Sequence, residues 1–351
     1  MKTIVLTGGG TAGHCIPHLA IYPYIKESFD KFVYIGSENG IERRIASSLF
    51  EYVPICTAKL KRELCFDNLL ILPRLLKGVN QAKIALKKIK PCLVFSKGGF
   101  VSVPVVIAAS QLKIPVVTHE SDFSMGLANK LIAPKCKMVL TSFKETSQKI
   151  KNGVYSGPPI KSFCLDKKKG LDYFGLTGDK PVLLVLGGSS GSLAINRAIT
   201  DLLPDLLDKY DVLHICGDKH ISSDKPISNI NHTGYIKIGY ANDMTPFYSA
   251  CDFAVSRAGA GALFELLSNK IPTLFIPLSK KASRGDQIEN AQYFYRKNAC
   301  LMLEEEAITK YSLTRKIGLL EKQSQILKDN MDLLRLTEGN KKIADAIKNF
   351  A

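Results

Sequence analysis

The 351-residue chain lacks any hydrophobic run of the ~18–20 residues that a membrane-spanning helix needs. Its start, MKTIVLTGGG, places only four apolar residues before the glycines, too few for the hydrophobic region of a secretory signal. The nine cysteines are odd in number, scattered and without a C-x-x-C pair, so neither a disulfide framework nor a zinc site is predicted. These absences predict a cytosolic chain whose cysteines are mostly small core residues.

Acidic residues are scarce in the first half of the chain. Residues 1–160 carry 22 Lys and Arg against 10 Asp and Glu, or +12, whereas the remainder carries 26 against 22, or +4. A charge concentrated in one half indicates an anionic partner for that half, such as nucleic acid, anionic lipid or a polyphosphate substrate.

Short apolar runs alternate with segments of helical periodicity, which is typical of parallel βαβ units. The proline- and glycine-rich stretch NGVYSGPPIKS (152–162) predicts a linker between two such domains. The pattern predicts strands at 2–7, 32–36, 52–57, 92–96, 115–118, 137–141, 181–186, 211–216, 252–255, 272–276 and 300–303. It predicts helices at 15–29, 39–50, 66–89, 101–112, 124–134, 192–208, 242–250, 261–269 and 287–297, and helical structure in most of 312–349.

A glycine loop follows the first strand of each half, so each half is predicted to be a doubly wound α/β domain. Gly8, Gly10 and Gly13 match G-x-G-x-x-G, the dinucleotide-binding pattern. The second strand ends in Ile35-Gly36-Ser37, where an acidic ribose ligand should stand, which disfavours NAD or FAD.

The loop Gly187-Gly188-Ser189-Ser190-Gly191 matches the nucleophile elbow G-x-S-x-G. That interpretation requires a histidine late in the chain, and the last 119 residues contain none. A second phosphate-binding loop is the better interpretation.

Polar residues also follow other predicted strands. His119-Glu120-Ser121-Asp122 follows PVVT, and either a site or a capped polar loop explains them. Arg257 and Glu265 flank the loop after DFAV, where a carboxylate can accept hydrogen bonds from two sugar hydroxyls.

The segment 59–90 carries nine basic and two acidic residues together with many leucines. Basic and apolar side chains together are typical of a surface that docks on a membrane. A core helix with a solvated basic face explains the periodicity equally well. Nucleic-acid binding would favour interleaved aromatic residues, and this segment contains only Phe66.

Six motifs together resemble the MurG glycosyltransferases, which add N-acetylglucosamine to the lipid-linked muramoyl-pentapeptide of peptidoglycan. In order, they are GGGTAGH, KGGFVSVP, HESDFSMGLANK, GGSSGS, RAGAGALFE and ASRGDQIENA. The resemblance covers nearly the whole chain. It implies the α/β GT-B fold, with two Rossmann-like doubly wound domains facing across a cleft, and an inverting transfer from UDP-N-acetylglucosamine without a metal or other cofactor.

The resemblance also implies a separate role for each domain. Residues 1–160 would hold the acceptor lipid and dock on the membrane, and 161–351 would bind the donor, with the last helix packing back on the first domain. His14 would be the general base. The implied donor contacts are Thr11, Ala12, Gly13, Asp122, Lys161, Ser189, Ala241, Arg257, Ala260, Gly261, Ala262, Leu263, Phe264, Glu265 and Gln287. The implied contacts to the acceptor diphosphate are Gly9, Gly10, Gly98, Gly99, His119 and Glu120, and the membrane residues are Leu70, Ile71, Arg74, Leu75, Lys77 and Lys83.

The motifs depart from the common family patterns at several positions. Ala12, Phe100 and Asp122 stand in TAGH, GGFVSVP and HESD, and Lys161 replaces the usual arginine. HESDFSMGLANK and RGDQIENA resemble the version of streptococci and related Gram-positive bacteria.

The physical features agree with this resemblance. A lipid diphosphate at an anionic inner membrane surface would attract the +12 half, and histidine suits removal of a proton from an alcohol. The expected location is the cytoplasmic face of the cell membrane, as a peripheral protein, with other cell-wall synthesis and division proteins as further partners and no nucleic acid. A diacylglycerol glycosyltransferase and a non-enzymatic nucleotide- or nucleic-acid-binding protein remain the alternatives.

Overall fold

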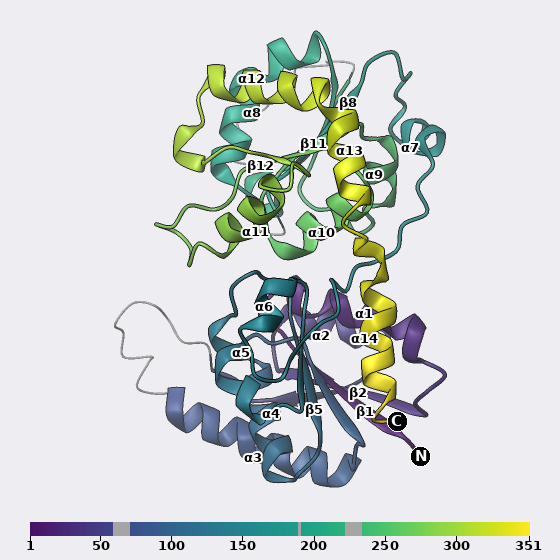
Figure 1. Cartoon of the computed structure of the whole chain (residues 1–351), viewed down its shortest axis with the longest axis vertical. Coiled ribbons are helices and arrows are strands. Elements are labelled where there is room, and N and C mark those ends of the chain that lie inside the picture. Colours follow the sequence, from purple (N-terminus) through teal and green to yellow (C-terminus); the bar gives the residue numbers. More distant parts are fainter. Residues whose placement is uncertain (59–70, 189–190, 222–233) are drawn as a thin grey trace. The chain divides into compact units, whose positions relative to one another are not determined.

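The computed structural model describes residues 1–58, 71–188, 191–221 and 234–351. The chain forms two compact units, one of Met1–Lys161 with Thr337–Ala351 and one of Ser162–Leu336 (Figure 1). Among the described residues, no helix is both long and apolar enough to span a membrane.

The first unit is built on a seven-stranded parallel sheet of order β3-β2-β1-β4-β5-β6-β7. Its strands are β1 (Thr3–Thr7), β2 (Lys31–Ser37), β3 (Glu51–Ile55), β4 (Leu93–Ser96), β5 (Val116–Glu120), β6 (Met138–Thr141) and β7 (Gly153–Tyr155). Its helices are α1 (Ile16–Ile25), α2 (Ile41–Ala46), α3 (Ile71–Ile89), α4 (Ser102–Gln111), α5 (Leu127–Ile132), α6 (Lys144–Gln148) and α14 (Gly339–Lys348).

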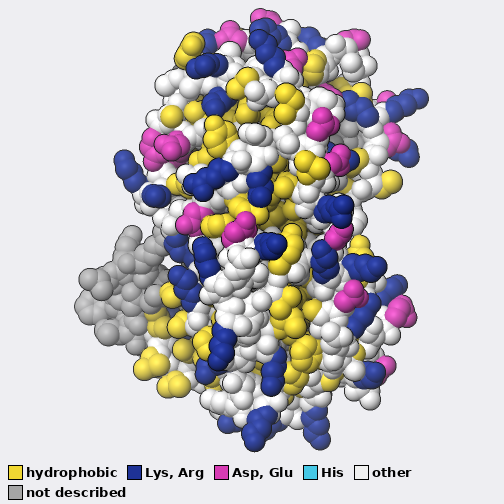
Figure 2. Space-filling view, viewed as in Figure 1, with side chains coloured by type: hydrophobic (Ala, Val, Ile, Leu, Met, Phe, Trp, Pro, Cys, Tyr) yellow, Lys and Arg dark blue, Asp and Glu magenta, His cyan; other side chains and the backbone are white. Residues whose placement is uncertain are grey.

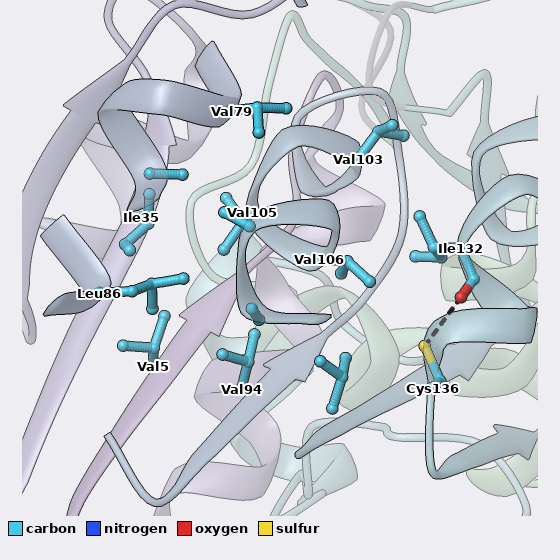
Figure 3. Close-up of a cluster of buried hydrophobic side chains, with 14 of the residues drawn as sticks. Val5, Ile35, Val79, Leu86, Val94, Val103, Val105, Val106, Ile132 and Cys136 are labelled. Atoms are coloured by element: carbon cyan, nitrogen blue, oxygen red, sulfur yellow. Dashed lines mark hydrogen bonds between the residues drawn. The ribbon is translucent and has the colours of Figure 1, made fainter. Parts of the chain in front are cut away.

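Helices cover both faces of this sheet, because side chains alternate between the faces along each strand. Val5 and Val94 point into a core with α3, α4 and α5, where Leu86, Val105 and Ile132 pack (Figure 3). The alternate residues of the same strands form a second core with α1 and α14. This core includes Ile4, Leu6 and Phe95 of the strands, Ile21 of α1, and Ile343 and Ile347 of α14. The C-terminal helix therefore completes the first unit.

The second unit contains a six-stranded parallel sheet of order β10-β9-β8-β11-β12-β13. Its strands are β8 (Val182–Leu186), β9 (Asp211–Ile215), β10 (Tyr235–Ile238), β11 (Phe253–Ser256), β12 (Thr273–Phe275) and β13 (Leu301–Met302). Its helices are α7 (Lys167–Phe174), α8 (Leu193–Leu207), α9 (Thr245–Ala250), α10 (Ala260–Ser268), α11 (Asp286–Tyr295), α12 (Lys310–Lys322) and α13 (Ser324–Asp332).

The predicted alternation of strands and helices is confirmed, with local corrections. The predicted linker 152–162 contains the edge strand β7, and the pattern did not predict β10, α6 or α7. The prediction of helix in most of 312–349 is confirmed by α12, α13 and α14, and Arg335, whose φ is 48°, lies in the break between α13 and α14. Residues 66–70 of another predicted helix lie outside the described residues.

Candidate active site

The strand order reverses once in each sheet, between β1 and β4 in the first and between β8 and β11 in the second. Ligands of such sheets bind beyond the carboxyl ends of the strands at this switch point. The loops that begin at Gly8 and Lys97 leave the first switch point, and those that begin at Gly187 and Arg257 leave the second. The sequence motifs therefore gather at the two expected positions.

At the first switch point the two glycine loops interlock. A Cβ atom on Gly99 would collide with the carbonyl oxygen of Gly9 and would lie 2.5 Å from Cδ2 of His14. A Cβ atom on Gly10, whose φ is 90°, would collide with the Phe100 ring. Only glycine fits at these two positions, and their close approach brings the His14 ring against the KGGF loop.

His14 ends a short 3-10 helix (Ala12–His14) and is half-buried. Burial, and secondarily the positive charge of Lys97, lower the pKa of His14 to about 4. The imidazole is therefore neutral at physiological pH and can accept a proton.

Lys97 is a buried cation that the sequence analysis included only as part of a motif. Its Nζ lies 2.8 Å from Nδ1 of His119 and donates to Oγ of Ser121 at 2.7 Å. Burial lowers the pKa of Lys97 to about 8, although the carboxylates of Glu120 and Asp122 act in the opposite direction.

The side chains of His119 and Glu120 are buried and bonded to protein groups, and their contact to the acceptor diphosphate stays a prediction. His119 is fully buried, and its Nε2 lies 3.1 Å from the carbonyl oxygen of Gly157 while its Nδ1 faces Lys97. Glu120 is 5% exposed, and its carboxylate accepts from the amides of Asp122 and Gly126. It also accepts from Nδ2 of Asn129 at 2.9 Å. Both side chains therefore help to hold the loop after β5.

Glu42, in the first turn of α2, is a buried carboxylate that the sequence analysis missed. It is 0% exposed, and its Oε2 accepts from the amide of Gly10 at 3.2 Å. Its Oε1 accepts from the amide and the hydroxyl of Ser37. The Gly10 amide therefore has a protein acceptor in the structure, and the contact of Gly10 to the acceptor diphosphate stays a prediction.

At the second switch point a pocket of about 110 Å³ opens at the carboxyl edge of the sheet. Its mostly apolar lining includes Gly188 after β8, Ile215 of β9, Ala241 after β10, Tyr248 of α9 and Ala262 of α10. Ala241 and Ala262 were both predicted to contact the donor. A pocket of this size suits one part of a ligand rather than a whole drug-sized molecule.

Glu265 lies on α10, whose N-terminus begins directly after the second switch point. Its Oε2 accepts a hydrogen bond from the hydroxyl of Tyr248 at 2.8 Å. Since Tyr248 also lines the pocket, the carboxylate is linked directly to the pocket wall.

Arg257 is buried, and its described partners are protein groups; its contact to the donor stays a prediction. Its guanidinium donates to the carbonyl oxygens of Ile276 and Pro277, both at 3.1 Å, and forms an ion pair with Glu305. It also donates to Oγ of Ser192 at 2.7 Å, and that oxygen accepts from the amide of Ile195 at the start of α8. Arg257 therefore fixes the start of α8.

The remaining predicted donor residues divide by exposure. Leu263 and Phe264 are core residues, so only their backbone can contact a ligand. Gly261 is exposed, and nothing lies within 4 Å of where a Cβ atom on it would be. Oε1 of Gln287 accepts from the amide of Leu278 at 3.0 Å. Ser189 lies outside the described residues, and Ala12 is buried. The other predicted donor residues are exposed or half-buried: Thr11, Gly13, Asp122, Lys161 and Ala260.

The predicted membrane surface is corrected in part. Leu75 is half-buried and packs against the core of the first unit, whereas Leu72, Leu76 and Ile84 of α3 are 61–63% exposed. Arg74 and Lys77 are exposed, Ile71 and Lys83 are half-buried, and Leu70 lies outside the described residues. Leu127 and Leu131 of α5 are exposed as well, and Figure 2 shows apolar side chains on the surface of the first unit.

Comparison with known proteins defines the class first. The N-terminal domain of glycosyltransferase family 28 matches residues 4–141, and the C-terminal domain of that family matches residues 182–349. The crystal structure of Acinetobacter baumannii MurG, 22% identical, covers 99% of this chain and 100% of its own with a TM-score of 0.73. The chain is a glycosyltransferase with the GT-B fold.

Relatives of the same length define the family. A Clostridium botulinum protein is 43% identical over 356 positions, covering 100% of this chain and 99% of its own. An Oceanobacillus iheyensis protein is 43% identical over 355 positions, covering 99% and 98%. Both are named UDP-N-acetylglucosamine–N-acetylmuramyl-(pentapeptide) pyrophosphoryl-undecaprenol N-acetylglucosamine transferase. The chain belongs to the MurG family.

Proposed function

We propose that this protein transfers N-acetylglucosamine from UDP-N-acetylglucosamine to undecaprenyl-diphospho-N-acetylmuramoyl-pentapeptide, the step from lipid I to lipid II in peptidoglycan synthesis. The observation that carries the proposal is the full-length similarity to relatives that bear this activity in their name. The positions of both sets of motifs at switch points support it.

The donor is bound by the second unit. The uracil enters the pocket beside Ala241, and the carboxylate of Glu265 accepts hydrogen bonds from the ribose hydroxyls. The diphosphate lies against the loop that contains Ser189 and against the backbone at the start of α10, where helix N–H groups favour negative charge. Gln287 contacts the sugar, and Arg257 acts indirectly by fixing the start of α8.

The acceptor is bound by the first unit, where Gly98 and Gly99 lie beside His14. The neutral imidazole of His14 removes the proton from the acceptor hydroxyl as its oxygen attacks C1 of N-acetylglucosamine. The bond from C1 to the UDP oxygen breaks, UDP leaves with the electron pair, and the configuration at C1 inverts. Backbone N–H groups at the helix termini stabilise the leaving diphosphate, so this mechanism needs no metal.

The first unit also docks on the cytoplasmic face of the cell membrane. The exposed apolar residues of α3 and α5 insert among the lipids, and Arg74, Lys77 and Lys83 meet their anionic headgroups. Cell-wall synthesis and division proteins are the further partners we propose, and nucleic acid is not a partner.

The motif variants HESD and RGDQIENA support placement in a Gram-positive, streptococcal-like subgroup. Asp122 and Lys161 are donor contacts that we propose for this subgroup.

The proposed activity is tested by measuring UDP release from UDP-N-acetylglucosamine with two acceptors in parallel. A muramoyl-pentapeptide diphospholipid should support turnover, and the lipid product should gain one N-acetylhexosamine by mass spectrometry. Diacylglycerol should give only the background rate. Turnover with diacylglycerol and none with the muramoyl lipid would identify the alternative membrane glycosyltransferase.

A further inference from the structure

We propose that Tyr248 is a positioning residue for nucleotide recognition: its hydroxyl orients Glu265 toward the ribose and so determines the selectivity for ribose over 2′-deoxyribose. The inference rests on the proposed function, because it assumes that Glu265 binds the ribose of the donor.

Tyr248 is held by packing and contacts two parts of the proposed nucleotide site. It is 3% exposed on α9, and its ring packs edge-to-face on Phe163 with 5.0 Å between centroids. It also forms part of the wall of the pocket proposed for the base. Its hydroxyl donates to Oε2 of Glu265 at 2.8 Å, so a single side chain contacts both the base pocket and the ribose-binding carboxylate.

The hydroxyl can act only as the donor in this pair. Burial, followed by the negative charge of Glu265, raises the pKa of Tyr248 well above its ordinary value of 10.0. The phenol therefore keeps its proton over the whole working range of pH. A donor fixed in a packed ring restricts rotation of the carboxylate that accepts from it.

A glutamate side chain has three rotatable bonds, so a hydrogen bond to the carboxylate of Glu265 restricts the orientations that it can adopt. A carboxylate held in one orientation meets the two ribose hydroxyls without first losing rotamer freedom. Without the Tyr248 hydroxyl, the carboxylate would still carry its charge but would be less well ordered. Affinity for the ribose hydroxyls should then fall, while contacts to the base and diphosphate remain.

The second unit contains a matched control. The hydroxyl of Tyr210 donates to Oε2 of Glu321 at the same distance of 2.8 Å, and neither residue lines the pocket. Tyr210→Phe therefore removes a tyrosine–glutamate hydrogen bond of the same kind without touching the proposed site.

The test is calorimetric titration of UDP and 2′-deoxy-UDP into the wild type, Tyr248→Phe and Tyr210→Phe. Loss of one hydrogen bond to a carboxylate should weaken UDP binding by Tyr248→Phe about 3- to 10-fold. Binding of 2′-deoxy-UDP should weaken less, so the ratio of the two affinities should shrink. Tyr210→Phe should keep the wild-type affinities and ratio. Partial misfolding lowers the number of binding sites but not this ratio, which keeps the test decisive.

Wild-type affinity and an unchanged ratio in Tyr248→Phe would overturn the inference. Glu265→Ala separates this failure from a failure of the proposed function. If Glu265→Ala weakens UDP binding and Tyr248→Phe does not, only the positioning role is wrong. If Glu265→Ala also binds UDP as the wild type does, the ribose assignment itself is wrong. In the Glu265→Ala background, Tyr248→Phe should have no further effect.

Discussion

At the scale of single residues, the most unusual group is the ammonium of Lys97, which is 2% exposed and has hydrogen bonds to His119 and Ser121. Both partners are neutral, so they do not compensate fully for the loss of hydration. A buried charge of this kind lowers stability, and Lys97 lies beside Gly8 and His14 at the first switch point.

The wild type should gain stability relative to Lys97→Met as the pH rises. Below about pH 8 the lysine is protonated in both the folded and unfolded states, so the full cost of burying the charge is present. Between about pH 8 and the ordinary pKa of 10.5, the folded state releases the proton first, and the wild type gains stability relative to the variant.

Urea unfolding at pH 8 and 9.5 measures this effect. The wild type should gain up to about 2 kcal/mol relative to Lys97→Met over this interval, at roughly 1.4 kcal/mol per pH unit. Parallel stability curves for the two proteins would show that the lysine is not buried as a cation.

His14 and Glu265 could be proposed from sequence because a motif at a strand end restricts where a side chain can lie. The roles of His119, Glu120 and Arg257 could not, because the same polar motifs serve equally for contacting a ligand and for holding a loop. The deciding partners, such as Gly157 for His119 and Ser192 for Arg257, come from distant parts of the chain.

At the scale of elements, α2 supports the first glycine loop through Glu42. Glu42→Ala should leave the amides of Gly10 and Ser37 buried without an acceptor, which lowers the free energy of unfolding by about 1–3 kcal/mol. The KM for the acceptor lipid should rise while UDP affinity stays at the wild-type value.

Glu42→Gln should be milder, because its carbonyl oxygen still accepts. Glu38→Gln is the matched control, since Glu38 is exposed in the same connection. A loss of stability with unchanged kinetics for both substrates would leave Glu42 with a purely structural role.

The exposed face of α3 predicts membrane docking. Changing Arg74, Lys77 and Lys83 together to glutamate should weaken binding to anionic vesicles by about 3 kcal/mol or more, over roughly 100-fold, at about 1 kcal/mol per basic residue. Turnover of a short-chain, water-soluble acceptor should survive. Added salt should weaken wild-type binding but leave an apolar remainder.

The control for this variant reverses three exposed charges of the second unit, Lys168, Arg315 and Lys322. It should sediment with vesicles as the wild type does. If the α3 variant also sediments with vesicles as the wild type does, the exposed face of α3 is an ordinary basic surface that does not dock on the membrane.

Hydrophobic periodicity correctly predicted whether a segment is a helix or a strand wherever the segment is long and buried, as for α4 and α8. β7 was missed because it is only three residues long, Gly153–Tyr155, and lies in a stretch rich in glycine and proline that predicts a linker. For the membrane face, the leucine-rich pattern identified α3 but not which leucines point outward. Contact with the core decides that Leu75 packs inward while Leu72 and Leu76 stay exposed.

At the scale of the whole molecule, two units of the same architecture carry different charge. The first unit has 26 Lys and Arg against 12 Asp and Glu, or +14, and the second has 22 against 20, or +2. The repeated strand–glycine loop–helix pattern was sufficient to predict two doubly wound domains. It could not place residues 337–351 in the first unit from periodicity, because that assignment depends on Ile343 and Ile347 packing against its sheet.

The central claim is that the second unit binds UDP while His14 of the first unit performs proton transfer. The most direct test compares UDP titration and turnover in His14→Ala and Glu265→Ala. His14→Ala should bind UDP as the wild type does but lose about 10²- to 10⁴-fold in kcat, the usual range for a positioned base. Glu265→Ala should lose about 10- to 150-fold in UDP affinity, because a charged hydrogen-bond acceptor contributes about 1.5–3 kcal/mol. Weakened UDP binding in His14→Ala, with wild-type binding in Glu265→Ala, would contradict the account.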